Sequence, residues 1–176
     1  MSYTPTTWVT GDVITATKLN NAETQYAEAI AYEPPSVKVK RTTDHTTTDA
    51  TEAIIEFDTE LWDNNVMHDT VSNKSQLKAT TAGLYLIIGG IRWKDPLSTR
   101  QGERRIRIRA NGTTHVAGQD TYVIDAQTTP YQSVVGTFSL AGGEYVELMI
   151  TSFSGSAENV EANYAFFEMR RIGAQP

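Results

Sequence analysis

The segment RRIRIRANG at residues 104–112 holds the side chains best suited to bind a charged ligand. On a β-strand its two isoleucines would share one face and three arginines the other, because successive side chains alternate. Guanidinium groups match phosphate and carboxylate, which would suit an anionic glycan, a teichoic acid or lipopolysaccharide phosphates. Alternatively, they pair with carboxylates of a neighbouring strand or subunit, such as Glu147 or Glu161, and the acidic composition favours this interpretation. The three residues are Arg105, Arg107 and Arg109.

Aromatic side chains on polar segments are a second candidate for ligand contact, because aromatic rings commonly line ligand sites. We expect Tyr122 and Tyr131 to lie on a polar surface loop, where they could contact a glycan. Trp62 is a weaker candidate, and Trp93 is expected in the core. The longest polar connections are expected to carry the ligand contacts, and these are 94–103, 118–131 and 154–161.

The sequence predicts no metal site. The three histidines lie in separate segments, without the short ligand spacing of a zinc site. His68 lies beside Asp69 and near Asp63. These side chains could either bind a cation or form a buried polar network. The run Asp63-Asn64-Asn65 offers oxygen ligands for calcium, but a turn made by side-chain-to-backbone bonds is the favoured interpretation.

No catalytic residue and no cofactor is predicted. The sequence contains neither a Gly-x-Ser-x-Gly elbow nor a phosphate-binding loop. The two catalytic carboxylates of a glycosidase are recognised by the distance between them in space, so the sequence alone does not exclude such a pair. The absence of cysteine excludes disulfides, thiolate metal ligands and cysteine nucleophiles. We therefore expect a protein that is not an enzyme.

Composition limits the partners. The 176 residues carry a formal net charge of −6, which disfavours a general nucleic-acid binder. No apolar run approaches the roughly 18–20 residues of a membrane-spanning helix, so no membrane insertion is expected. The first residues lack the basic and apolar regions of a secretory signal, so we expect a protein that does not use the ordinary secretory route.

Residues 34–176 have the pattern of an all-β head domain, an antiparallel sandwich or jelly roll of about ten strands. The polar stretch 42–51 is expected to be a surface loop. Asn111-Gly112 predicts a hairpin of type I′, and Gly142-Gly143 predicts another tight reversal. The expected strands are Val37–Arg41, Ala53–Phe57, Gln76–Ala79, Leu84–Trp93, Arg104–Ala110, Thr113–Ala117, Gln132–Leu140, Tyr145–Phe153 and Ala162–Ile172.

Residues 1–33 are expected to form a separate N-terminal element. Its first part reads as an extended arm with four apolar residues, namely Trp8, Val9, Val13 and Ile14. Thr15 is placed to cap a short helix, which the prolines after Glu33 would end. Such a helix is marginal alone, and its apolar spacing is typical of a short coiled-coil seam. The seam residues are Leu19, Ala22, Tyr26 and Ala29.

Both N-terminal features have plainer alternatives. The arm could be a leader whose Trp8 folds back on its own domain. The helix could instead lie on the parent sandwich, with its apolar side facing that surface.

Two strands of the head are apolar at nearly every position, LYLIIGGIRW at 84–93 and YAFFEM at 164–169. In an antiparallel sheet with one face in water, apolar and polar residues alternate along each strand. These two strands lack this alternation, so we expect both of their faces to be buried. The simplest cover is another copy of the chain, which predicts a homotrimer. The side chains expected in its interface or in the core are Tyr85, Ile87, Tyr164, Phe166 and Phe167.

The head resembles the trimeric jelly-roll superfamily of the complement recognition subcomponent and tumour necrosis factor. The resemblance covers about residues 36–173, and its motifs occur in the family's order. They are Phe57, Asp63-Asn64-Asn65, Leu77, Gly83-Leu84-Tyr85, the turn from Leu140 to Leu148, and Tyr164-Ala-Phe-Phe167. In that family the sheet with the Gly-x-Tyr strand and the last strand lines the three-fold axis, which implies the same here.

The N-terminal stretch resembles the W-x-x-G-D-x-I-T-A-x-x-L-N opening of bacteriophage fibre and receptor-binding proteins. The matching residues are Trp8, Gly11-Asp12, Ile14-Thr15-Ala16 and Leu19-Asn20. This implies a virion protein, made in the host cytoplasm, whose arm docks on another virion protein of the tail, baseplate or capsid. Its head would adhere to the host surface through a cell-surface glycan.

Two other functions fit the same architecture. One is a capsid head fibre or decoration protein with a structural role and no specific receptor. The other is the head of a cellular lectin or collagen-like protein, against which the missing secretion signal and collagen repeats argue.

Overall fold

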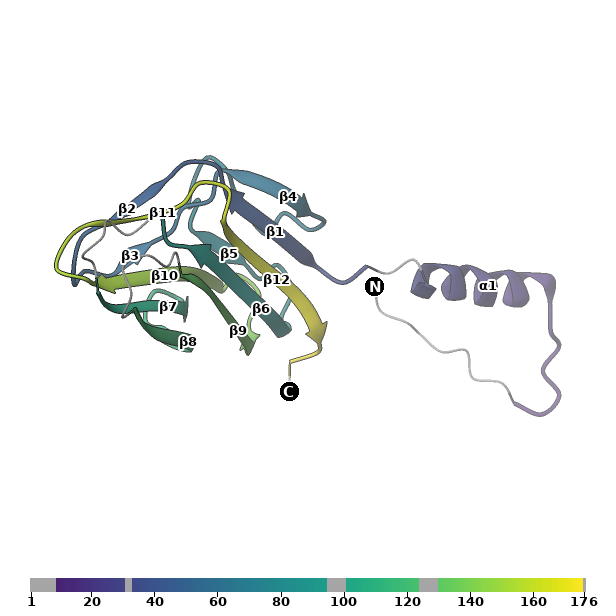
Figure 1. The fold of residues 1–176 in the computed structure, drawn as a ribbon. Coiled ribbons are helices and arrows are strands. Elements are labelled where there is room, and N and C mark those ends of the chain that lie inside the picture. The colour runs from purple at the N-terminus through teal and green to yellow at the C-terminus, as the bar shows by residue number, and fades with distance from the viewer. Residues whose placement is uncertain (1–8, 31–32, 95–100, 124–129, 176) are drawn as a thin grey trace. The chain divides into compact units, whose positions relative to one another are not determined.

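The computed structural model describes residues 9–30, 33–94, 101–123 and 130–175 (Figure 1). The chain divides into two units, Met1–Glu33 and Pro34–Pro176. Among the described residues, no helix is long and apolar enough to cross a membrane.

The N-terminal unit contains helix α1, Ala16–Ile30. Thr15 caps it as the sequence predicts, because its Oγ1 accepts a hydrogen bond from the Lys18 amide at 3.3 Å. A turn precedes the helix. The Val9 amide donates to Asp12 Oδ2 at 3.1 Å, and the Asp12 amide donates to the Val9 carbonyl at 3.0 Å.

The head is built from two five-stranded antiparallel sheets (Figure 1). The β6 sheet has the strand order β4-β1-β12-β6-β9, formed by Thr59–Asp63, Ser36–Arg41, Ala165–Gly173, Gly83–Arg92 and Tyr131–Leu140. The β10 sheet has the order β3-β10-β7-β8, formed by Ala53–Ile54, Tyr145–Phe153, Gly102–Ala110 and Thr114–Val123, and β5 (Gln76–Lys78) also pairs with β10. The short strands β2 (His45–Thr47) and β11 (Glu158–Val160) form a third, two-stranded sheet.

The core lies between the two large sheets, as a jelly-roll sandwich requires. Ile106 and Ile108 of β7 are fully buried, whereas the arginines that alternate with them are half-buried, which confirms the predicted alternation. Phe57 and Phe167 stack at the centre with ring centroids 5.8 Å apart. The prediction of an all-β sandwich is confirmed.

Close approach between the sheets explains one glycine. A Cβ on Gly89 of β6 would lie 2.4 Å from Leu148 Cδ1 of β10, so the Leu148 side chain would have to move to make room for it. The buried Leu148 therefore fills the space that Gly89 leaves open.

The hairpin between β7 and β8 is the predicted one. Asn111 and Gly112 have φ angles of 49° and 72°, and both angles belong to a type I′ turn. The Asn111 side chain also donates to Glu144 Oε1 at 2.9 Å, which ties this hairpin to the turn between β9 and β10.

Four predicted loops are wrong in part, and one of them, 94–103, includes Gly102 and Glu103 of β7. Residues 42–51 contain β2, and 154–161 contain β11, which pairs with it. The expected loop 118–131 begins with six residues of β8, so Tyr122 lies on a strand, and Tyr131 is the first residue of β9. Polar residues mark β8 because it is the edge strand of its sheet and its outer face meets water. Strand β4 was not predicted.

Candidate functional site

The described apolar residues of the N-terminal arm are exposed. Val9, Val13 and Ile14 have exposed fractions of 65%, 72% and 68%, and Leu19 on the helix is also mostly exposed. Ala22 is exposed as well. Trp8 lies outside the described residues, as do the side chains of Tyr26 and Ala29. Three large apolar side chains are thus open to water within six residues, so a partner that covered them would bury apolar area.

The side chains predicted for a trimer interface or the core divide between the two faces of the β6 sheet. Tyr85, Ile87 and Phe167 are fully buried in the core. Phe166 points to the opposite, outer face, where its ring lies 5.0 Å from Lys38 Nζ. Tyr164 precedes β12 and is 40% exposed, with the Arg92 guanidinium 3.9 Å from its ring centre.

The outer face of the β6 sheet carries apolar side chains from three adjacent strands, which we call the outer apolar patch. The pairing of β6 with β9 sets Ile88 beside Val135, which is 58% exposed. On β6 the patch residues alternate with core residues. Glu168, which forms an ion pair with Lys38 at 3.1 Å, interrupts the apolar run of β12. The outer face of β12 is therefore more polar than expected. The patch consists of Leu84, Leu86, Ile88, Val135 and Phe166.

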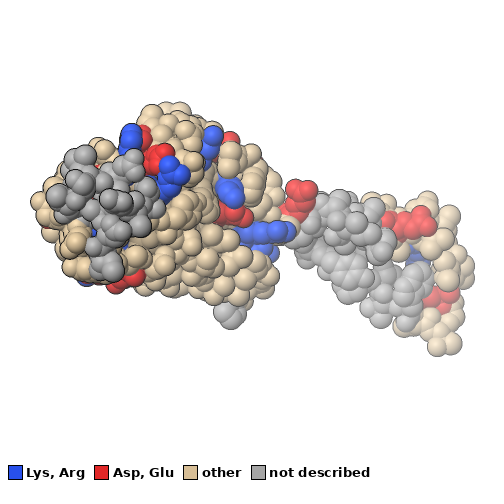
Figure 2. Space-filling model, in the orientation of Figure 1, with Lys and Arg blue, Asp and Glu red and all other residues tan. Residues whose placement is uncertain are grey.

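The arginines of β7 are paired with carboxylates. Arg105 forms a two-point bond with Glu103, with nitrogen–oxygen distances of 2.7 and 3.1 Å. Arg107 binds Asp120 at 2.8 Å, and Arg109 binds Glu147 at 2.9 Å. Glu161, the other partner suggested by sequence, instead binds Arg92 at 2.5 Å. Figure 2 shows the same mixture on the head, where basic and acidic side chains lie next to one another.

These ion pairs shift the ionisation of their members. The hydrogen bond from Arg105 holds the pKa of Glu103 below its usual value, and the same bond raises the pKa of the Arg105 guanidinium. Both groups are therefore charged at neutral pH and neutralise each other. The stripe is not a surface of unpaired positive charge, which removes the main electrostatic reason for an anionic ligand there.

The Asp63–Asn65 run makes a turn. The Asp63 carboxylate accepts hydrogen bonds from the amides of Asn65, Met67 and His68 at 3.0, 2.7 and 2.9 Å. The His68 ring is buried, with Nδ1 3.1 Å from Glu60 Oε1 and Nε2 3.1 Å from the carbonyl oxygen of residue 74. The described residues hold no group of three acidic, histidine or cysteine side chains arranged to bind a metal.

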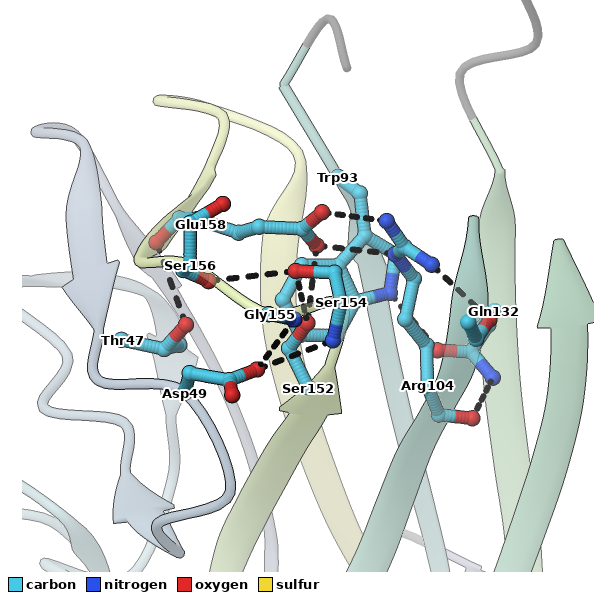
Figure 3. Close-up of polar contacts among 11 residues, drawn as sticks. Thr47, Asp49, Trp93, Arg104, Gln132, Ser152, Ser154, Gly155, Ser156 and Glu158 are labelled. Atoms are coloured by element: carbon cyan, nitrogen blue, oxygen red, sulfur yellow. Dashed lines mark hydrogen bonds and ion pairs between the residues drawn. The ribbon is translucent and has the colours of Figure 1, made fainter. Parts of the chain in front are cut away.

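A buried polar network at one end of the sandwich was missed by the sequence reasoning (Figure 3). Arg104 and Glu158 are 1% and 4% exposed and form an ion pair, with Arg104 Nε donating to Glu158 Oε2 at 2.8 Å. A second Arg104 nitrogen donates to Glu158 Oε1. Arg104 alternates in register with the core isoleucines, so the β7 pattern places it inside the sandwich.

The network joins all three sheets. Gln132 of β9 donates to the Arg104 carbonyl at 3.0 Å and accepts from Trp93 Nε1 at 2.7 Å. Ser152 of β10 donates to Glu158 Oε2 at 3.1 Å. Trp93 is 1% exposed, so its core position is as expected. The network therefore ties together the ends of β7, β9, β10 and β11.

A second anchor fixes the segment after β10. The Asp49 carboxylate accepts hydrogen bonds from the amides of Ser154 and Gly155, both at 2.9 Å (Figure 3). Gly155 has a φ of 80°, a conformation that suits glycine. The expected ligand loop 154–161 is thus held by specific bonds at both ends.

The two candidate tyrosines lie on different sheets. Tyr122 of β8 is 66% exposed on the β10 sheet, and Tyr131 of β9 is 54% exposed on the β6 sheet. The structure does not bring them together into one surface on a single sheet. Phe153, which was not predicted as a site residue, lies on the β10 sheet and is 37% exposed. The candidate segments 95–100 and 124–129 lie outside the described residues.

Comparison of structures identifies the head's architecture. The chain is similar to the globular domain of zebrafish complement 1qA protein, with a TM-score of 0.59 and 16% sequence identity, over 80% of this chain and 98% of that one. The head has that jelly-roll fold. Neither protein-family models nor curated proteins match the sequence. At this identity the similarity establishes the fold alone, which confirms the part of the predicted resemblance that concerns the head.

Proposed function

We propose that the chain is a non-enzymatic bacteriophage virion protein, a homotrimeric fibre or knob. Its N-terminal arm docks on another virion protein, and its jelly-roll head adheres to the host surface. The single observation that carries this proposal is the exposure of Val9, Val13 and Ile14, because a binding partner would remove these apolar side chains from water. They lie within the stretch that resembles phage fibre openings.

The outer apolar patch supports a trimeric head. Half-buried Leu84, Leu86 and Ile88 lie along β6, and Ile88 pairs with exposed Val135 of β9. The family places this sheet around its three-fold axis. Contact with two further copies would bury these side chains. The three heads of one trimer could also bind a repetitive host surface at the same time, which would raise the overall affinity of individually weak contacts.

Docking of the arm is tested by assembly. The double variant Val13→Asp, Ile14→Asp should fold as a head but fail to join the particle, because charge would be buried without a partner in the docked state. Particles purified from a host that expresses the variant would be assayed for the chain by immunoblot. Val66→Asp is the matched control, since Val66 is 85% exposed on the head.

Normal incorporation of the double variant would refute docking through this stretch. Labelled wild-type chain imaged by electron microscopy on whole particles would show its position. Label on the tail or baseplate supports an adhesion role, whereas label on the capsid alone, with normal adsorption of particles that lack the chain, refutes it.

A further inference from the structure

We propose that one surface of the β10 sheet is a binding platform for an uncharged saccharide, an inference that rests on the proposed adhesive function. The platform consists of Glu103 and Arg105 of β7, Tyr122 of β8 and Phe153 of β10. Glu103 pairs directly with Tyr122 on one side and with Phe153 on the other. The two aromatic residues therefore flank the Glu103–Arg105 pair on three adjacent strands.

All four side chains share the outer face of the sheet. Glu103 and Arg105 alternate with the buried Arg104 and Ile106, so they point away from the core. Tyr122 lies next to buried Val123 and is 66% exposed. The Cα atoms of Tyr122 and Phe153 are about 10 Å apart, twice the interstrand spacing of about 4.8 Å.

The ion pair at the centre keeps capacity for further hydrogen bonds. Both Glu103 oxygens accept from Arg105, whose guanidinium carbon lies 4.5 Å from the centre of the Phe153 ring. Among the described residues, Arg105 Nη1 makes no hydrogen bond, and each carboxylate oxygen has a lone pair left. A sugar hydroxyl both donates and accepts, so neighbouring hydroxyls can use the two groups together.

Tyr122 supplies the apolar surface. Its ring is the most exposed large aromatic among the described residues, and its hydroxyl has no partner among them. An exposed aromatic beside fixed polar groups can cover the carbon-bound face of a sugar ring while the polar groups bind its edge. The Glu103–Arg105 pair is already formed in the free protein, so these two groups do not have to be brought together on binding.

The charge balance selects an uncharged ligand. Arg105 is neutralised by Glu103, and the next arginine, Arg107, is neutralised by Asp120. Glu52 adds a further negative charge close enough to act on Arg105. An anionic glycan would meet no net positive charge here, whereas a neutral hexose needs none.

Binding would be tested on an array of bacterial surface polysaccharides, neutral and anionic, with the full-length chain. The best neutral glycan would then be titrated by calorimetry. We expect Tyr122→Ala to weaken its affinity by about tenfold or more, and Tyr122→Phe by no more than about threefold, because the ring carries the contact. Tyr131→Ala is the matched control and should leave the affinity unchanged.

A second variant is expected to gain binding to a different class of glycan, which a misfolded protein would not do. Glu103→Gln keeps the shape but removes the carboxylate that is hydrogen-bonded to Arg105, so the platform becomes more positive and should gain binding to the anionic glycans on the array. Binding confined to anionic glycans in the wild type, no binding to any glycan, or loss of affinity in Tyr131→Ala but not in Tyr122→Ala would overturn the inference.

Adsorption of particles to the host separates this inference from the function on which it rests. If Tyr122→Ala particles adsorb poorly but no neutral glycan is bound, the saccharide inference fails and the adhesive function stands. If neutral glycans bind as expected but particles lacking the chain adsorb normally, the adhesive function fails and the binding platform stands.

Discussion

At the scale of single residues, the buried ion pair between Arg104 and Glu158 gives a sharp prediction about stability. Both side chains are almost completely buried, and each is held by more than one hydrogen bond. A buried pair adds little net stability over an apolar replacement, because desolvation offsets the attraction. Removal of one partner should lower stability much more, since the other side chain is left buried with an uncompensated charge.

We expect Arg104→Met to destabilise the head by about 3–5 kcal/mol, because the Glu158 carboxylate loses its counter-charge. The double variant Arg104→Met, Glu158→Met should lose clearly less than this single variant. Urea unfolding followed by tryptophan fluorescence would measure both. If the loss in the double variant equals the sum of the losses in Arg104→Met and Glu158→Met, the two side chains do not act as a pair.

Gly89 makes a second prediction at this scale. Gly89→Ala should cost about 1–3 kcal/mol of unfolding free energy, because the new methyl group overlaps Leu148. Gly142→Ala is the matched control, since its Cβ would lie 3.7 Å from the nearest atom. If both variants unfold at the same urea concentration, the sheets do not approach as closely as described.

At the scale of elements, the short strands β2 and β11 depend on contacts outside their own ladder. Asp44, just before β2, accepts a hydrogen bond from the Ala162 amide at 2.8 Å and also pairs with Lys94. The hydrogen bond from the Lys94 side chain lowers the pKa of Asp44 from its ordinary value of 3.8, and the hydrogen bond from the Ala162 amide lowers it further by a smaller amount. Because the folded pKa is lowered, this contribution is present above about pH 3.8 and is lost as the pH falls through the folded value.

An acid titration by nuclear magnetic resonance should therefore show the Ala162 amide proton shifting with a midpoint below pH 3.8. The shift follows loss of the charged acceptor on Asp44. Asp44→Asn should abolish the titration and leave the shifts of β7 unchanged. A midpoint at or above pH 3.8 would contradict the bond from Asp44 to this amide.

At the scale of the whole molecule, the outer apolar patch is the surface that would join copies of the chain. Wild-type protein is expected to sediment at three times the chain mass of 19.5 kDa. Ile88→Asp should convert it to a folded monomer, because a charge at a dry interface has no partner. Val71→Asp is the control and should remain trimeric, since Val71 is already 82% exposed. A monomeric wild type at micromolar concentration would refute the trimer.

Local signals in the sequence were sufficient for the cap of the helix, the Asn111-Gly112 hairpin and the alternation of β7, because each depends on residues within a few positions. The sandwich class followed from the number and spacing of such signals. The pairing of β2 with β11 could not be predicted, since each strand is three residues long and gains its stability from a partner far along the chain.

The sequence by itself determined that this is a β-rich head preceded by an apolar arm and a capped helix, because period and turn chemistry are local properties. Only the tertiary structure decided which charges meet. Arg104 and Glu158 are 54 positions apart, and Asp49 and Ser154 are 105 apart. Tyr122, Glu103 and Phe153 become neighbours through strand register alone, which is fixed by the packing of both sheets on a shared core.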